Sequence, residues 1–134
     1  MATILAHITV KEGTEARFEA IARQLHQATH AHETGVRAYG YWRGQAPRTY
    51  YTLLAFDDFR SFIRHQTSEH HEGASPDLGQ VMEGIRLEWV DPIQGASTLP
   101  PTQTQEIPDD ADELTRRYAR RFAAQVADWW AALR

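Results

Sequence analysis

Four segments of this chain have the β-branched and aromatic composition of strands, and each is apolar on both faces. They are residues 3–10, 36–43, 49–56 and 85–90. Neighbouring strand positions face opposite sides, so Tyr39 and Trp42 put aromatic side chains on opposite faces of the second segment. Helices packed on one side of a sheet leave its other side bare. The sequence therefore predicts a sheet whose second face needs a cover, and the economical cover is a second copy of the chain.

The first strand leads into a predicted helix. Apolar residues recur at spacings of three and four from Phe18 to His32, and polar residues take the other side. Thr14 is in place to cap the start of this helix, and Gly35 to end it.

A second helical segment follows the third strand. Asp57 or Asp58 is expected to cap a short helix that presents Phe62 on its apolar side. Residues 67–76 are polar and are expected to form a loop or a frayed helix end, with one or two helical turns over residues 77–83. The order β-α-β-β-α-β predicts an α+β, ferredoxin-like, four-stranded antiparallel sheet with helices on one face.

The chain divides into three predicted parts. Residues 1–94 form the ferredoxin-like domain, and residues 95–109 are an extended linker with little to bury. Residues 110–134 are expected to form one amphipathic helix, opened by a capping box at Asp110–Glu113. An apolar stripe of this length does not stay in water, so we expect the helix to dock on its own chain or on the dimer mate.

Composition narrows the class of protein. The absence of cysteine excludes disulfides, thiolate metal sites and cysteine nucleophiles. The net charge of −4 argues against nucleic acid or anionic lipid as a partner. The apolar runs are too short to span a membrane, and the N-terminus lacks the pattern of a signal peptide, so we expect a cytoplasmic protein.

Residues 3–93 resemble the antibiotic biosynthesis monooxygenase family. The resemblance rests on Ile8–Gly13 before the first helix, on Thr34–Val36 at the second strand, and on the signature Phe62-Ile-Arg-His65-Gln-Thr-Ser68-Glu-His70. It implies a homodimeric α/β barrel. It also implies cofactor-independent oxidation of an aromatic, polyketide-like or quinol small molecule, with O₂ as co-substrate.

The family also holds other chemistries, which stay open as alternatives. Its haem-degrading members resemble one another at an Asn, a Trp and a His, where this sequence has Ala6, His65 and Ser75, so haem is disfavoured. The alternatives are a non-catalytic small-molecule-binding or assembly protein on the same fold, or a haem-handling or isomerase relative. Apart from O₂, no cofactor is expected.

Histidine is the natural base for such a reaction, because its ordinary pKa lies near neutral pH. All seven histidines lie between His7 and His71. The resemblance makes His65 the first candidate for a catalytic role, and mid-strand His7 is the second. The expected substrate-binding residues are Trp42, Tyr51, Phe62, His32, His70 and Arg86.

Each candidate also has a structural interpretation. The aromatic side chains can serve core or dimer packing, and Arg86 can pair with Glu88 or Glu33 across the sheet. Possible metal-binding groups are His26 with His30, and His65 with His70 and Glu69, but neither spacing is specific. No metal site is therefore expected.

Overall fold

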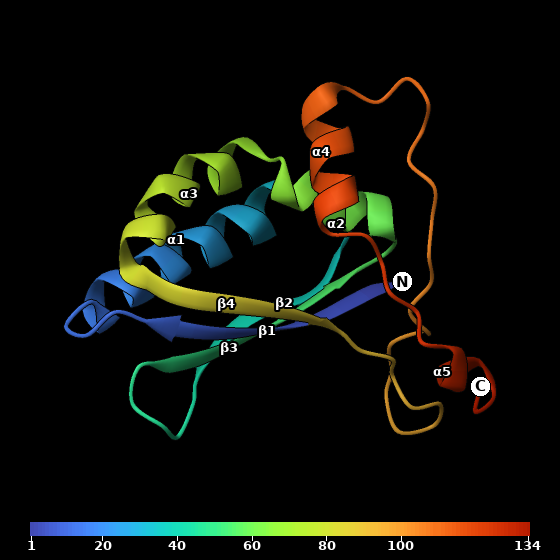
Figure 1. Cartoon of the computed structure of the whole chain (residues 1–134), viewed down its shortest axis with the longest axis horizontal. Coiled ribbons are helices and arrows are strands. Elements are labelled where there is room, and N and C mark those ends of the chain that lie inside the picture. Colours follow the sequence, from blue (N-terminus) through green and yellow to red (C-terminus); the bar gives the residue numbers. More distant parts are fainter.

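The four predicted strands form one antiparallel sheet in the computed structural model, which describes residues 1–134. The strands are β1 (Ala2–Val10), β2 (Val36–Arg43), β3 (Thr49–Phe56) and β4 (Met82–Trp89). Their order across the sheet is β2-β3-β1-β4, so the first strand lies inside and β2 and β4 are the edges. The predicted ferredoxin-like fold is therefore confirmed (Figure 1).

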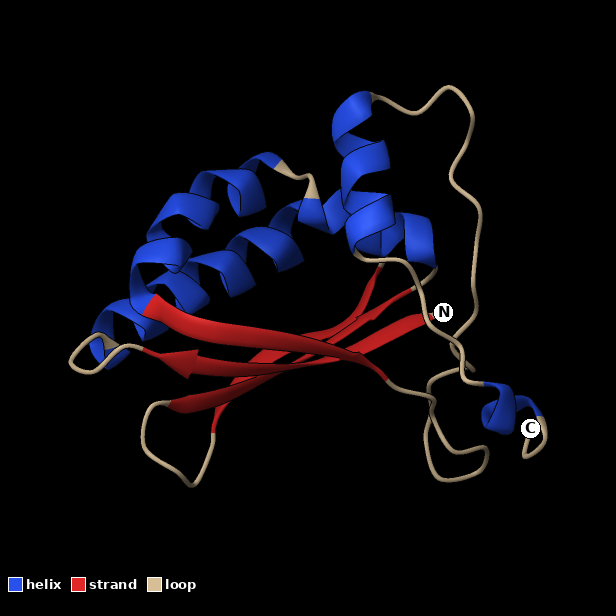
Figure 2. Cartoon of the chain, viewed as in Figure 1, coloured by secondary structure: helices blue, strands red, loops and turns tan.

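Three helices cover one face of the sheet: α1 (Glu15–His32), α2 (Phe59–Gln66) and α3 (Glu69–Val81) (Figure 2). The even-numbered residues of β1 point toward these helices, and Ile4 is fully buried there. Phe18 of α1 and Phe62 of α2 are buried in the same core. The periodicity of the sequence predicted both of these contacts.

No helix covers the other face (Figure 2). Trp42 is 54% exposed on it and Tyr51 39%, although both are large apolar side chains on strands. In the strand register Trp42 lies beside Tyr51, Tyr51 beside His7, and His7 beside Arg86. The sheet thus has the bare second face that its doubly apolar strands predict.

The prediction of a loop or a frayed helix end over residues 67–76 is wrong, because a regular helix, α3, begins at Glu69. The hydroxyl of Ser68 accepts a hydrogen bond from the backbone N–H of His71, which caps the helix. Glu69 and Glu72 lie in the first turn, where a negative charge favours helix formation. His70 and His71 therefore lie on a helical turn, and Pro76 does not interrupt the helix.

The first helix differs from expectation at both ends. Thr14 holds the N-cap position, but its hydroxyl donates to the carbonyls of Lys11 and Val81 instead of capping the helix. The helix ends at His32, before Gly35. Gly35 meets α2 closely, since a Cβ atom there would lie 2.6 Å from Oγ of Ser61.

Residues 95–134, which follow β4 after a short connection, are called the C-terminal arm below. One helix was predicted over residues 110–134, but the structure has two, α4 (Glu113–Arg121) and the single turn α5 (Asp128–Ala131). Phe122 is the residue that follows α4, and its ring packs 6.0 Å from that of Phe62. The arm thus packs on α2 of its own chain (Figure 1). No helix has the length and apolar character that crossing a bilayer requires.

Candidate functional site

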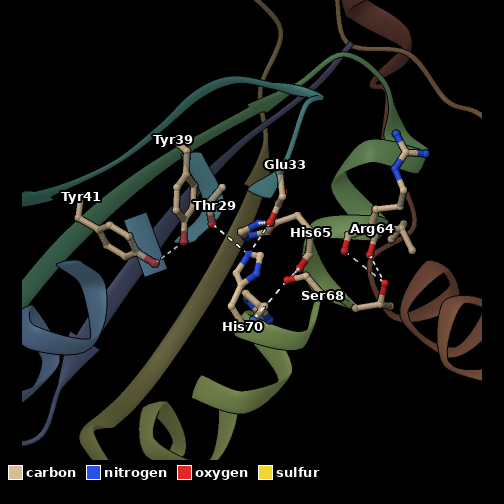
Figure 3. A network of polar contacts seen from close by, with 11 residues as sticks. Thr29, Glu33, Tyr39, Tyr41, Arg64, His65, Ser68 and His70 are labelled. Carbon is tan, nitrogen blue, oxygen red and sulfur yellow. Dashed lines mark hydrogen bonds and ion pairs between the residues drawn. The ribbon is translucent and has the colours of Figure 1, made fainter. Parts of the chain in front are cut away.

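Two histidines and a glutamate meet where the end of α1 approaches the junction of α2 and α3 (Figure 3). Glu33 is the residue that follows α1. His65 lies in the last turn of α2, and His70 in the first turn of α3, with only a short connection between the two helices. The Ser68 hydroxyl fixes that connection by donating to the carbonyl of His65. These three side chains, Glu33, His65 and His70, are called the histidine cluster below.

One carboxylate oxygen joins the histidine cluster. Oε1 of Glu33 lies 2.9 Å from Nδ1 of His65 and 2.7 Å from Nε2 of His70. Burial raises the pKa of Glu33, but the hydrogen bonds and charges of the two histidines outweigh burial and leave this pKa below its ordinary value. Glu33 is therefore ionised, and both ring nitrogens donate to it.

In the neutral form of an imidazole, such a contact places the ring proton on the nitrogen that faces the carboxylate and leaves the other nitrogen as an acceptor. That other nitrogen is Nε2 in His65, where it is covered and has no hydrogen-bond partner. In His70 it is Nδ1. The His65 side chain is only 1% exposed and that of His70 is 19% exposed. Of the two, His70 is thus the group that solvent or a ligand reaches.

Aromatic rings surround the buried side of the cluster. The ring of His65 lies 4.9 Å from that of Tyr39 and 5.1 Å from that of Phe56. The hydroxyls of Tyr39 and Tyr41 are 2.7 Å apart, and burial raises the pKa of Tyr39 above its ordinary value and that of Tyr41 to about 12. His71 packs its ring 4.9 Å from His65, and burial lowers its pKa to about 3. All of these neighbours are uncharged near neutral pH.

A cavity of about 740 Å³ adjoins the histidine cluster, and Glu33 and His70 are part of its wall. Its remaining lining residues are mostly polar: Ala28, His32, Thr34, Gly35, Ser61, Arg64, Ser68 and Glu69. Arg64 is exposed and donates a hydrogen bond of 2.6 Å to the Ser61 hydroxyl. The cavity therefore offers a base, a cation and several hydroxyls to one ligand.

The cluster also has the donor set of a metal site. The ligand atoms of Glu33, His65 and His70 all lie within 4.8 Å of one another. Two imidazoles and a carboxylate suit a transition metal, but here the same atoms satisfy one another as hydrogen-bond donors and acceptor. The sequence placed Glu69 with these histidines, whereas the structure places Glu33 there.

Aromatic side chains line a different cavity. This cavity, of about 550 Å³, lies between α1 and the edge strand β2, and its aromatic walls are Phe18, Tyr41, Trp42 and Tyr50. His26 is exposed and lines this cavity as well. The aromatic-walled cavity and the histidine cluster thus occupy separate places.

Most of the remaining predicted site residues lie together on the bare face of the sheet, apart from the histidine cluster. His7 lies on the bare face of the sheet, where its Nε2 is 2.9 Å from Oε2 of Glu88, and the predicted pairing of Arg86 with Glu88 is present at 3.0 Å. Tyr51 lies edge-on to His7 on the same face. Phe62 belongs to the core.

The structure brings the predicted residues His65 and His70 into the histidine cluster, and His32 joins His70 in the polar cavity. A second group of predicted residues lies side by side on the bare face, away from this cavity: Trp42, Tyr51, His7 and Arg86. His32 is exposed rather than part of the apolar face of α1. Glu33 was missed as a site residue. The topology of the predicted fold could have indicated it. Glu33 directly follows the first helix, and the antiparallel fold brings the second helical segment back to the C-terminal end of that helix.

Comparisons with known proteins agree with this fold. The family model for antibiotic biosynthesis monooxygenases matches residues 1–76. A protein from Pseudomonas aeruginosa superposes with a TM-score of 0.61 at 22% identity, over 66% of this chain and 90% of its own. A protein from Mycobacterium tuberculosis gives 0.65 at 15% identity, over 72% and 98%.

A crystal structure of an antibiotic biosynthesis monooxygenase gives a TM-score of 0.64 at 18% identity, covering 69% of this chain and 99% of that one. The comparison with curated proteins gives no match. The structural likenesses show the fold, and the family model covers more than half of the sequence. The chain therefore belongs to the antibiotic biosynthesis monooxygenase family.

Proposed function

We propose that this protein oxidises a hydroxylated aromatic small molecule, such as a quinol or a polyketide-like phenol, with O₂ and without a metal or flavin. The observation that carries the proposal is the pair Glu33–His70 at the wall of the 740 Å³ cavity. A carboxylate that holds one nitrogen of an imidazole leaves the other as an oriented base. Membership in a family of monooxygenases supports the same reaction class.

The chemistry asks the protein for a proton acceptor and for stabilisation of an anion. The phenol O–H gives its proton to Nδ1 of His70, and the phenolate that forms lies near the exposed guanidinium of Arg64 in the same cavity. The electron-rich ring carbon then forms a bond with O₂, and His70 returns the proton to the peroxide. The hydroperoxide carbon then loses its own hydrogen with the terminal OH as water, which leaves a carbonyl. For an anthrone, whose enol tautomer is the reacting phenol, the net change is that a ring CH₂ and O₂ become C=O and H₂O.

His65 has a positioning role in this scheme. It is buried behind Glu33 and is not part of the cavity wall, so it acts on the substrate only through the carboxylate it shares with His70. The hydrogen bond that Nδ1 of His65 donates to Oε1 keeps Glu33 ionised and holds its carboxylate beside His70.

We also propose that two copies of the chain pair through the bare face of the sheet. Trp42 and Tyr51 are exposed there, and Leu5 and Leu53 are partly exposed beside them. A contiguous apolar surface of this kind usually marks an interaction site. The bare face has the same residues in each copy, as a twofold interface requires.

The activity test uses a reduced naphthoquinone or an anthrone, with O₂ consumption measured in a metal-free buffer. His70→Gln removes the base, and we expect kcat to fall by about 10²–10⁴-fold with thermal stability close to wild type. Glu33→Gln should lower kcat as well, because it no longer fixes the tautomer of His70.

His26→Gln is the matched control, since His26 lines only the aromatic cavity and should leave turnover unchanged. If His26→Gln abolishes turnover while His70→Gln does not, the substrate lies in the aromatic cavity and the proposal fails. It also fails if folded wild-type protein turns over none of a panel of phenols and quinols.

A further inference from the structure

The C-terminal arm builds a third cavity against the rest of the chain. This cavity has a volume of about 470 Å³. Its lining residues come from the sheet and α2 on one side and from the arm on the other: Ile4, Phe62, Arg86, Leu87, Glu88, Trp89, Arg121, Phe122, Ala123, Gln125, Val126, Ala127 and Trp130. The family model ends at residue 76, so the arm's wall lies outside the matched segment.

Contacts on either side of this cavity hold the arm in place. Before it, the Tyr118 hydroxyl donates to the carboxylate of Glu72 on α3. After it, the guanidinium of Arg134 pairs with Asp91 at 2.7 Å. The arm segment between these contacts is therefore anchored at both of its ends, which lowers the cost of ordering it around a ligand.

The walls of the cavity suit a flat ring. Trp89 lies edge-on to Phe62 with ring centroids 5.6 Å apart, and Phe122 lies edge-on to Phe62 from the arm side. Trp130 is half-buried and completes the aromatic lining. Aromatic rings favour edge-to-face and offset contacts with one another, so a bound aromatic ring gains contacts here.

The charge of the cavity comes from one unpaired cation. Arg86 and Glu88 are 3.0 Å apart and offset each other. Arg121 forms no ion pair, and its guanidinium lies 5.1 Å from the centre of the Phe122 ring. A guanidinium can hold a planar anion through two parallel hydrogen bonds.

We propose that this cavity is a binding site for a flat aromatic anion, an aryl carboxylate or sulfonate. The ring lies among Phe62, Trp89 and Trp130, and the anionic group pairs with Arg121. None of these residues lines the cavity of His70, so the inference does not rest on the proposed reaction.

The test titrates the full chain with 2-naphthoate by calorimetry, with 2-naphthalenemethanol as the uncharged analogue. We expect 2-naphthoate to bind, and the alcohol to bind about tenfold more weakly because it lacks the charge. Arg121→Gln should weaken the binding of 2-naphthoate by about tenfold, so that the acid and the alcohol bind this variant with similar affinity.

The chain provides matched controls beside both key residues. Arg120 pairs with Glu113 and does not line the cavity, so Arg120→Gln should bind as wild type does. Trp130→Ala should lose most of the binding, whereas Trp129→Ala should keep it, because Trp129 is 66% exposed and outside the cavity.

Equal binding of acid and alcohol, or equal losses in the two arginine variants, would overturn the proposal. Loss of binding in His70→Gln with full binding in Arg121→Gln would move the ligand to the polar cavity and overturn it too. Turnover of quinols plays no part in these measurements, so the two proposals fail separately.

Discussion

Protonation of His71 should set much of the acid sensitivity of this fold. Its ring packs on His65, near Glu33 and His70, and its Nδ1 is covered without a partner. Burial lowers the pKa of His71 from 6.5 to about 3 in the folded chain. Between these two values the unfolded chain binds one more proton than the folded chain. The free energy of unfolding must therefore decrease as pH falls below about 6.5.

One proton of difference is worth at most about 1.4 kcal/mol per pH unit. Lowering the pH from 6.5 to 5 should thus cost the wild type about 2 kcal/mol through His71, a large part of the stability of a small domain. Replacing His71 with Leu removes the titrating group and keeps an apolar side chain on the helix. The free energy of unfolding of the variant should therefore fall less steeply than that of the wild type as the pH is lowered. The difference between the two slopes should correspond to nearly one bound proton.

The assay is urea unfolding followed by far-ultraviolet circular dichroism at several pH values, with protein concentration held constant because association changes apparent stability. Carboxylates and the other histidines titrate in both proteins, so their contributions largely cancel in the difference. His32→Gln is the control, since His32 is exposed and this variant should keep the wild-type slope. Parallel curves for wild type and His71→Leu would refute the reasoning.

Three further changes test the packing. Leu53→Arg puts a charge on the bare face of the sheet. Light scattering should show a folded monomer for this variant and a dimer for the wild type. A monomeric wild type would contradict the proposed pairing. Phe122→Ala removes the ring that packs on Phe62 and should cost about 2 kcal/mol in thermal unfolding, and an unchanged stability would mean that the arm is not docked in solution. Gly35→Ala brings a Cβ atom to 2.6 Å from the Ser61 hydroxyl and should cost about 1–3 kcal/mol, so a neutral result would show that α2 shifts freely there.

The hairpin of β2 and β3 shows what local sequence can predict. Both strands have the residue bounds that the composition of residues 36–43 and 49–56 indicated. Strand periodicity is a local property, and doubly apolar strands also indicated a face without its own cover. Local patterns predicted the wrong helix bounds in the C-terminal arm, where segments that are distant in the sequence are in contact. Helix α4 ends at Arg121, and the next residue, Phe122, packs on Phe62, a contact between distant segments that no helical pattern reveals.

The histidine cluster was only half predictable for a related reason. His65 and His70 were found through a sequence signature that keeps them five positions apart. Their shared partner Glu33 is 32 residues before His65, and only the antiparallel return of the chain brings them together. The capped turn at Ser68 was read as part of a loop, because its polar and small residues suit a loop and a helix start equally.

One backbone contact couples the arm to the centre of the sheet. The amide of Gln103 donates to the carbonyl of Met1 at 2.9 Å, directly before β1, and β1 is an interior strand. Opening of the arm therefore removes a hydrogen bond at the beginning of an interior strand as well as contacts on a surface helix. Amide hydrogens at the beginning of β1 should then exchange with solvent together with those of the arm, as one cooperative unit.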